Sequence, residues 1–342
     1  MTIKVEFQRE VLQDGDYVTS ANFTSDRKID LNDVNFTIHD EKIDIKKISK
    51  NKFYFGQNEK LATIHFGSNF QDHFVLPEIS VHINDLDDNI VSEFKEDPIA
   101  EKFTTNFYHG KETLSYYLYT SQSKSKKRPM VVFLHGSGER GYGDRYPLWG
   151  NDVAEQIVRY VKSHEDAVVV APQATWRKEL NGWFRKSVRK TLMDLIKYLI
   201  KTENIDQKRV YLLGLSNGGA GTWHFAENHP DMFAAIAPCC GYIYNDGKYF
   251  LEAPGKGRYM EPTENEANAL KDMPIWAFAA ADDNVVNPDG TRHTVKAIKE
   301  AGNKNIRETI YDAGMLGNNP HNSWKLAYHE QDLFPWMFKQ KK

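Results

Sequence analysis

The feature that most constrains this chain is a glycine–serine turn placed directly after a run of apolar residues. The apolar residues Val210–Leu213 run into Gly214-Leu215-Ser216-Asn217-Gly218, and a helical pattern follows over Ala220–Ala226. A Gly-x-Ser-x-Gly motif between a strand and a helix predicts a sharp turn that exposes the serine hydroxyl. The turn also directs the first N–H groups of the helix toward whatever the hydroxyl attacks. We therefore predict that Ser216 is a nucleophile rather than an idle serine in a glycine-rich turn.

Apolar strands and amphipathic helices alternate on both sides of this turn. The run Met130–Leu134 is continuously apolar, which is typical of a parallel strand buried on both faces. The other predicted strands are 103–108, 113–119, 167–171, 210–213, 234–238, 275–280 and 307–311, and the other predicted helices are 153–161, 188–200 and 294–301. This order predicts an α/β fold with a doubly wound, mostly parallel sheet, in which chemistry gathers at the carboxyl ends of the strands.

The first hundred residues show no helical period. They contain short alternating runs separated by turn-forming clusters at 13–16 and 84–89; the runs are 34–38, 53–55, 61–66 and 79–83. This pattern predicts an all-β sandwich of immunoglobulin-like size. Because 342 residues exceed one small core, we expect two domains, 1–100 and 101–342, joined near Glu96-Asp97-Pro98.

Composition narrows the expected partners and location. The net charge is −3, which argues against a nucleic-acid or anionic-membrane partner and leaves a possible homo-oligomer open. The start of the chain lacks the apolar core of a signal peptide. The two cysteines, Cys239 and Cys240, are adjacent and poorly placed for a structural disulfide. These features favour a cytoplasmic location, although a trimmed export signal would leave the same sequence.

A serine nucleophile needs a base, and the base needs an orienting acid. Asp282 and Asp283 follow the predicted strand 275–280, and His321 follows the predicted strand 307–311. The chain order Ser, Asp, His is the order of the α/β-hydrolases. Because adjacent side chains leave a strand end in opposed directions, only one of the two aspartates is expected to face His321.

Acyl transfer also requires N–H donors for the developing oxyanion. One expected donor is the N–H of Asn217, and the second is the N–H of Ser137, with Gly138 as the alternative. Ser137 lies in Gly136–Gly141, which reads literally as the G-x-G-x-x-G of a dinucleotide site. No helical pattern opens there, and the next strand ends in Ala171-Pro172-Gln173 without an acidic residue, so we reject nucleotide binding.

Several motifs make residues 103–342 resemble the esterase branch of the α/β-hydrolases. The motifs are Leu134-His135-Gly136-Ser137-Gly138-Glu139-Arg140-Gly141, Ala171-Pro172-Gln173, Gly214–Gly219 and His321-Asn322-Ser323-Trp324. They are similar to those of polyhydroxybutyrate depolymerases, feruloyl esterases, "predicted peptidases" and dienelactone hydrolases. The resemblance implies nucleophile Ser216, base His321 and an acid within Asp282-Asp283. The family's acid sits two residues before a Val-Val pair, which implies Asp283. Some relatives carry an immunoglobulin-like domain before the hydrolase domain.

The chain departs from these relatives at two places. They usually carry Met where this chain has Asn217, and His-Gly where it has Ala279-Ala280. Both changes affect the expected pocket wall and spare the catalytic side chains. Trp149, Trp183 and Trp324 fall in predicted loops and are candidate substrate contacts, with plain packing as the alternative. The Tyr-rich stretch 241–271, which includes Tyr249, is either a lid or pocket wall or an irregular surface loop.

The sequence therefore predicts a serine carboxylesterase that hydrolyses a small-molecule ester through an acyl-enzyme. No His/Cys/Asp cluster has metal-ligand spacing, and the expected chemistry needs neither a metal nor a cofactor. A serine peptidase of the same fold is the alternative, ranked lower because no acidic cluster marks a pocket for a substrate amine. A third possibility is that the N-terminal sandwich binds a carbohydrate or a protein and the hydrolase domain is secondary.

Overall fold

The computed structural model describes residues 2–26, 28–68, 71–84, 89–121, 127–177, 182–246, 251–252 and 257–342. The chain forms two compact units. The first contains Met1–Ser68, Asp72–Lys102 and Trp149–Asp152, and the second contains Phe103–Leu148 and Val153–Lys342. The segment Trp149–Asp152 therefore groups with the first unit, whereas we placed all of 101–342 in the second domain.

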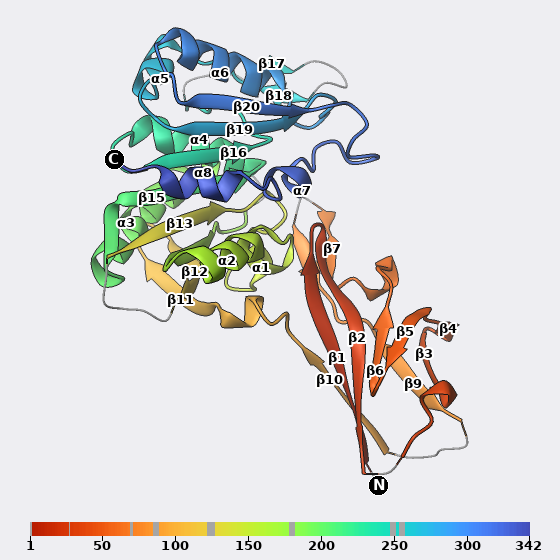
Figure 1. Ribbon diagram of the computed structural model, residues 1–342. Coiled ribbons are helices and arrows are strands. Elements are labelled where there is room, and N and C mark those ends of the chain that lie inside the picture. The colour runs from red at the N-terminus through yellow and green to blue at the C-terminus, as the bar shows by residue number, and fades with distance from the viewer. Residues whose placement is uncertain are drawn as a thin grey trace. The chain divides into compact units, whose positions relative to one another are not determined.

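The first unit is all-β, and its elements can be followed from the N-terminus in Figure 1. Its strands are β1 (Thr2–Leu12), β2 (Gly15–Ser25), β3 (Val34–Ile38), β4 (Glu41–Lys42), β5 (Ile45–Ser49), β6 (Lys52–Phe55), β7 (Ile64–Phe66), β8 (Asp72–Phe74), β9 (Ile79–Ile83) and β10 (Asn89–Lys95). They form a five-stranded sheet in the order β10-β1-β2-β6-β5, a three-stranded sheet β4-β3-β9 and the pair β7-β8.

Aromatic side chains fill the core of this unit. Phe36 lies edge-on to Phe7, Phe23 and Phe53, with ring centroids 5.1 to 6.1 Å apart. The expected strands at 34–38, 53–55 and 79–83 are present; in the run 61–66, Leu61 ends a 3-10 turn and Ile64–Phe66 form β7. Sequence alternation did not single out the long hairpin β1–β2, whose pairing shifts register between Gln8 and Arg9.

The second unit follows the predicted alternation of strands and helices. Its strands are β11 (Thr104–His109), β12 (Thr113–Thr120), β13 (Arg128–Leu134), β14 (Val168–Gln173), β15 (Ile205–Leu215), β16 (Ala235–Cys239), β17 (Leu251–Glu252), β18 (Arg258–Tyr259), β19 (Ile275–Ala280) and β20 (Ile306–Tyr311). Its helices are α1 (Tyr146–Trp149), α2 (Val153–His164), α3 (Lys186–Thr202), α4 (Asn217–Asn228), α5 (Glu264–Ala269), α6 (Asp289–Glu300), α7 (Trp324–Ala327) and α8 (Leu333–Lys339).

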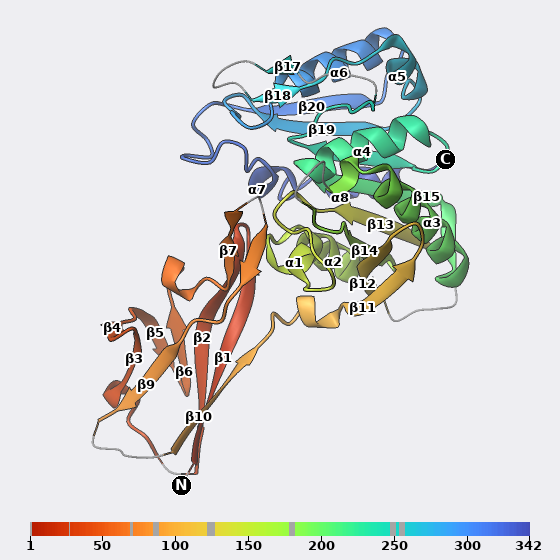
Figure 2. The same ribbon diagram turned by 180° about the vertical axis from the view of Figure 1, so that it is seen from behind.

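Eight of these strands form one sheet in the order β11-β12-β14-β13-β15-β16-β19-β20. The pairs β11–β12 and β12–β14 are antiparallel, and the pairs from β14 to β20 are parallel. Helices cover both faces: α2 and α8 lie in front of the sheet in Figure 1, and α3 and α4 lie in front of it in the reverse view of Figure 2. The predicted doubly wound, mostly parallel fold is confirmed.

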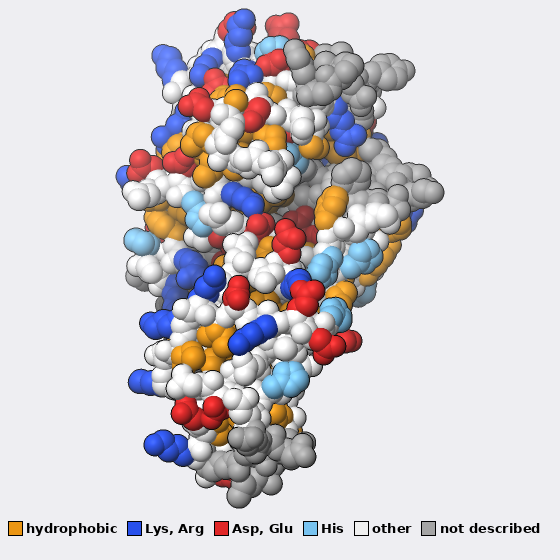
Figure 3. Space-filling model, turned by 90° about the vertical axis from the view of Figure 1, so that its right-hand side faces the viewer, with side chains coloured by type: hydrophobic (Ala, Val, Ile, Leu, Met, Phe, Trp, Pro, Cys, Tyr) orange, Lys and Arg blue, Asp and Glu red, His pale blue; other side chains and the backbone are white. Residues whose placement is uncertain are grey.

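Two predicted stretches lie partly outside the described residues. These are the turn 84–89 and the part of 241–271 that contains Tyr249. In the described part of the chain, no helix combines the length and the apolar character needed to span a membrane. Acidic and basic side chains are intermixed on the face shown in Figure 3.

Candidate active site

Ser216 occupies the sharp turn that the sequence predicts between β15 and α4. Its backbone has φ 52° and ψ −114°, a region that residues other than glycine rarely adopt. Its N–H donates to the carbonyl of Cys239 at 3.0 Å, and its own carbonyl accepts the first helical bond from Ala220 at 2.9 Å. A Cβ on Gly218 would lie 1.9 Å from the carbonyl oxygen of Leu134, so only glycine allows this close approach.

The base and the acid converge on this serine from two neighbouring parallel strands. His321, in the loop after β20, has its Nε2 2.9 Å from Ser216 Oγ. Its Nδ1 lies 2.8 Å from Oδ2 of Asp283, which follows β19. Because a carboxylate only accepts, Nδ1 carries the proton and Nε2 is free to accept one from the serine. The structure thus brings together all three residues predicted as the triad.

The two aspartates at the end of β19 diverge. Asp283 is 3% exposed, and its Oδ1 accepts the N–H groups of Val285 and Val286 at 2.9 and 3.0 Å. These two bonds hold the carboxylate so that Oδ2 faces His321. Asp282 instead accepts the N–H of Gly314 through Oδ2 at 2.8 Å. The predicted choice of Asp283 over Asp282 therefore agrees with the geometry.

The surroundings of His321 favour its protonated form. Burial alone lowers the pKa of His321, whereas the hydrogen bond to Asp283 and the charge of its carboxylate raise it, and the net direction is upward. Burial also holds the pKa of the Cys240 thiol well above its usual range, so this thiol is neutral at pH 7. Asp283 is therefore the charged partner that stabilises the imidazolium. Both cysteines are free and buried.

The predicted oxyanion segments lie beside the serine. A Cβ on Gly136 would lie 3.7 Å from Ser216 Cβ, so the loop after β13 passes next to the nucleophile. Arg140, which is 2% exposed, donates through Nε to the carbonyl of Ser137. Asn217 is the first residue of α4. A loop without a helix occupies Gly136–Gly141, in agreement with the rejection of a dinucleotide site.

Gln173 organises the rest of this loop, a role that the sequence did not reveal. The side chain is fully buried, and its Oε1 accepts from Ser115, Tyr117 and the N–H of Gly143 at 2.9 to 3.1 Å. Its Nε2 donates to the carbonyl of Glu139 at 2.8 Å. The motif Ala171-Pro172-Gln173 was visible in the sequence, but its partners come from distant segments.

The three predicted tryptophans have different surroundings. Trp324 is half-buried, and its ring lies edge-on to His321, with centroids 5.7 Å apart. Trp183 is only 1% exposed, which favours packing over the substrate contact that we expected. Trp149 belongs to the first unit, where it stacks on the Arg9 guanidinium at 4.6 Å and donates to Glu96 at 2.7 Å. These bonds give Trp149 a packing role within that unit.

A buried tyrosine is hydrogen-bonded to the strands that carry the site, and the sequence analysis did not identify it. The Tyr328 hydroxyl, at the end of α7, lies 2.8 Å from the carbonyl of Gly214 and 3.0 Å from that of Ala237. Ser323, two residues after His321, contacts Cys239 Sγ through its hydroxyl at 3.3 Å. The segment that carries His321 is therefore tied to the ends of β15 and β16.

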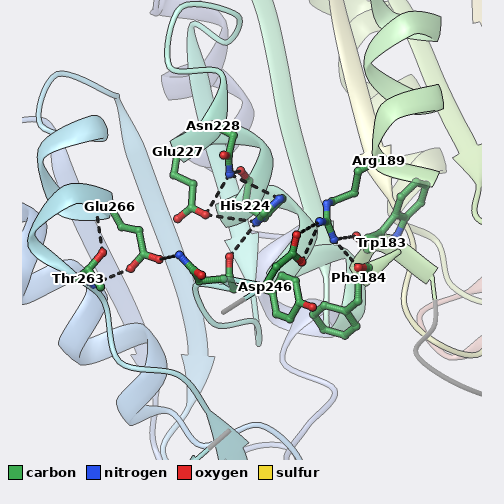
Figure 4. A network of polar contacts seen from close by, with 11 residues as sticks. Trp183, Phe184, Arg189, His224, Glu227, Asn228, Asp246, Thr263 and Glu266 are labelled. Carbon is green, nitrogen blue, oxygen red and sulfur yellow. Dashed lines mark hydrogen bonds and ion pairs between the residues drawn. The ribbon is translucent and has the colours of Figure 1, made fainter. Parts of the chain in front are cut away.

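The described part of the Tyr-rich stretch packs beside the serine helix. Tyr242 and Tyr244 join Phe184, Ala220 and Val286 in a buried cluster that also includes Met260. Figure 4 shows how polar side chains from three helices hold this stretch in place. Arg189 of α3 pairs with Asp246, His224 of α4 bonds the carbonyl of Tyr244, and Glu266 of α5 bonds Asn245. Side chains of three helices thus hold this segment as far as residue 246.

Among the described residues, no group of three or more His, Cys, Asp or Glu side chains is arranged to hold a metal ion. At this site a serine hydroxyl, an imidazole and a carboxylate lie in one hydrogen-bonded chain. This is the arrangement of a serine hydrolase on an α/β sheet.

Comparisons with known proteins agree with an α/β-hydrolase fold. Residues 173–339 match the model of the prolyl oligopeptidase family. The crystal structure of a thermostable esterase superposes with a TM-score of 0.81, at 27% identity over 99% of both chains. The fold and these matches place the chain in the α/β-hydrolase fold class.

Two proteins of similar sequence are named as esterases. A feruloyl esterase B of Talaromyces funiculosus is 27% identical over 41% of this chain and 39% of its own length. A bifunctional acetylxylan esterase/xylanase of Neocallimastix patriciarum is 28% identical over 36% of this chain and 17% of its own. The chain thus spans less than half the length of either relative.

Proposed function

We propose that the protein is a serine carboxylesterase that uses Ser216, His321 and Asp283 as its catalytic triad. The observation that carries this proposal is the unbroken hydrogen-bonded chain from Ser216 Oγ through the imidazole to Asp283. The strained serine at the start of α4 supports it, because such a turn presents both the hydroxyl and the helix N–H groups to one carbonyl.

The geometry supports the following reaction. Ser216 Oγ attacks the ester carbonyl carbon while its proton moves to His321 Nε2, and Asp283 stabilises the imidazolium. The N–H groups of Ser137 and Asn217 hold the oxyanion of the tetrahedral intermediate. His321 then protonates the leaving alkoxide, the C–O bond breaks and an acyl-enzyme remains. Water repeats the sequence and releases the carboxylic acid.

The proposed substrate is an ester of a short-chain or aromatic acid, and esters of these acids on a carbohydrate are included. Phe184, Tyr242 and Tyr244 form a buried aromatic cluster against Ala220 of α4, one turn after the serine, so the neighbourhood of the site is apolar. The esterases named for acetylxylan and feruloyl groups add support from outside the chain. A serine peptidase is the second candidate, because the matching family model is that of prolyl oligopeptidases.

A panel of model substrates separates the two candidates. We expect measurable turnover of p-nitrophenyl acetate, p-nitrophenyl butyrate and methyl ferulate, and at least about 100-fold lower kcat/KM on aminoacyl p-nitroanilides, whose amine leaves only with full protonation. Comparison of acyl groups then ranks short-chain against aromatic acids. Faster cleavage of an anilide than of every ester would favour the peptidase.

The pH dependence of the reaction should report His321. The imidazole must be neutral to accept the serine proton, so kcat/KM should rise with pH as His321 deprotonates. Because the Asp283 carboxylate raises the pKa of His321, the midpoint should lie on the alkaline side of 6.5. The measurement is kcat/KM for an uncharged ester between pH 5.5 and 9.5. A flat profile would contradict the assignment of His321 as the base, and a midpoint at or below 6.5 would contradict the upward shift of its pKa.

A further inference from the structure

We infer that Trp183 is a positioning residue that sets the distance between the two walls of the oxyanion hole. The inference rests on the proposed function and extends it to a residue that does not touch the substrate. The two expected donors, on Ser137 and Asn217, belong to separate segments, the loop after β13 and the start of α4. Their N–H groups stabilise one oxyanion only if these segments keep a fixed spacing.

Trp183 is hydrogen-bonded to both segments at once. Its indole Nε1–H donates to the carbonyl of His135, two residues before Ser137, at 3.0 Å. Its backbone N–H donates to the side-chain Oδ1 of Asn217, also at 3.0 Å. One fully buried residue therefore joins the loop that carries the first donor to the residue that carries the second.

The loop end of this bridge is itself fixed. His135 is 0% exposed, its Nδ1 lies 2.6 Å from the carbonyl of Gly136, and its Nε2 accepts the N–H of Ala174 at 3.0 Å. Burial lowers the pKa of His135 to about 3, so the ring stays neutral and keeps this bonding pattern at working pH. The rings of His135 and Trp183 also pack, with centroids 5.1 Å apart.

The tryptophan end is fixed by close packing. Gly182 has φ +60°, and a Cβ there would lie 2.7 Å from Asn217 Oδ1. A Cβ on Gly221, one turn into α4, would lie 2.9 Å from Trp183 Cβ. Arg189 donates to the carbonyl of Phe184, and Figure 4 shows this guanidinium between residues 183–184 and Asp246. The bridge therefore has little freedom to move.

The bridge accounts for Asn217, one of the two places at which the chain departs from the relatives that it resembles. A methionine there offers only a weak acceptor, whereas the Asn217 amide oxygen takes the Trp183 N–H at 3.0 Å. The polar side chain next to the nucleophile is then a structural partner of Trp183 and not a substrate contact.

The test compares Trp183→Phe with Trp223→Phe in the full chain. Trp223 is a matched control: it is fully buried in the same unit, and among the described residues its Nε1 has no hydrogen-bond partner. Loss of a whole oxyanion donor costs about 10²- to 10³-fold in kcat, so loss of the tether in Trp183→Phe should cost about 10- to 100-fold. We expect KM within about twofold of wild type and little change in kcat for Trp223→Phe.

Inhibition by a trifluoromethyl ketone distinguishes a positioning role of Trp183 from a purely structural one, because the inhibition constant depends on the oxyanion hole. Ser216 Oγ adds to the ketone carbonyl carbon, the proton passes to His321, and the resulting oxyanion occupies the oxyanion hole. For Trp183→Phe the inhibition constant should rise by the same factor by which kcat/KM falls, while the pH midpoint stays that of wild type. Equal effects of the two Phe variants, or an unchanged inhibition constant, would overturn the inference.

A second variant, Asn217→Leu, tests the other end of the bridge, and Ser216→Ala tests the proposed function separately. Asn217→Leu removes the acceptor for the Trp183 N–H with little change in size, and it should show the same parallel loss of turnover and ketone affinity. Ser216→Ala is the reference for the proposed function. If Ser216→Ala is inactive while Trp183→Phe and Asn217→Leu both behave as wild type, the bridge alone is wrong. If Ser216→Ala keeps turnover, the proposed function is wrong.

Discussion

Ser216→Ala is expected to abolish ester hydrolysis, with a loss in kcat on the order of 10⁴ to 10⁶, the scale seen when a serine nucleophile is removed. The Ser216 hydroxyl lies 2.9 Å from His321 Nε2, the nitrogen that is to accept its proton. Folding should be almost unaffected, since alanine tolerates φ 52° about as well as serine does. The change therefore removes the nucleophile and leaves the turn.

The measurement is steady-state turnover of a p-nitrophenyl ester together with labelling by a fluorophosphonate and mapping of the modified peptide. Ser163→Ala, on the exposed face of α2, is the matched control and should label and turn over as wild type. Label on a peptide without Ser216, or wild-type turnover in Ser216→Ala, would show that another residue is the nucleophile.

Local sequence could predict the parts of the fold that depend on the burial of a strand or on the steric limits of a turn. Parallel strands buried on both faces must be continuously apolar, so Met130–Leu134 of β13 and Val210–Leu213 of β15 stand out in the sequence as apolar runs. The turn at Ser216 needs glycine at 214 and 218 because a Cβ at either position would collide with neighbouring backbone, and the Gly-x-Ser-x-Gly motif records this requirement. Because parallel strands end at the same edge, the order of Ser216, Asp283 and His321 along the chain was enough to predict that they meet.

The contacts that local sequence could not predict join distant segments through polar atoms. Gln173 bonds Ser115 and Tyr117, more than fifty residues away, and nothing in the local pattern around residue 173 announces those partners. A tryptophan in a predicted loop is equally compatible with a substrate contact in a pocket and with a packing role in the core. Only the fold shows that Trp183 is buried, that Trp149 stacks on Arg9, and that Trp324 faces His321.

Asp283→Asn is expected to lower kcat on the order of 10⁴, the scale seen when a triad aspartate is amidated. Oδ1 of residue 283 accepts two backbone N–H groups, from Val285 and Val286, so the amide of an asparagine will place its oxygen there. Its NH₂ group then faces His321 Nδ1 in place of Oδ2. An NH₂ group can only donate, so Nδ1 becomes the acceptor and the proton moves to Nε2. In that tautomer Nε2 cannot take the proton of Ser216.

Asp282→Asn is the matched control, one residue away on the same strand end. Asp282 accepts the N–H of Gly314 through a single oxygen, and an asparagine keeps an oxygen for that bond. Its kcat should therefore fall by no more than a few-fold. Both variants should be compared side by side for kcat, with folding checked by circular dichroism. A larger loss in Asp282→Asn than in Asp283→Asn would reverse the assignment, because it would mean that the carboxylate bonded to Gly314 turns toward His321 in the working enzyme.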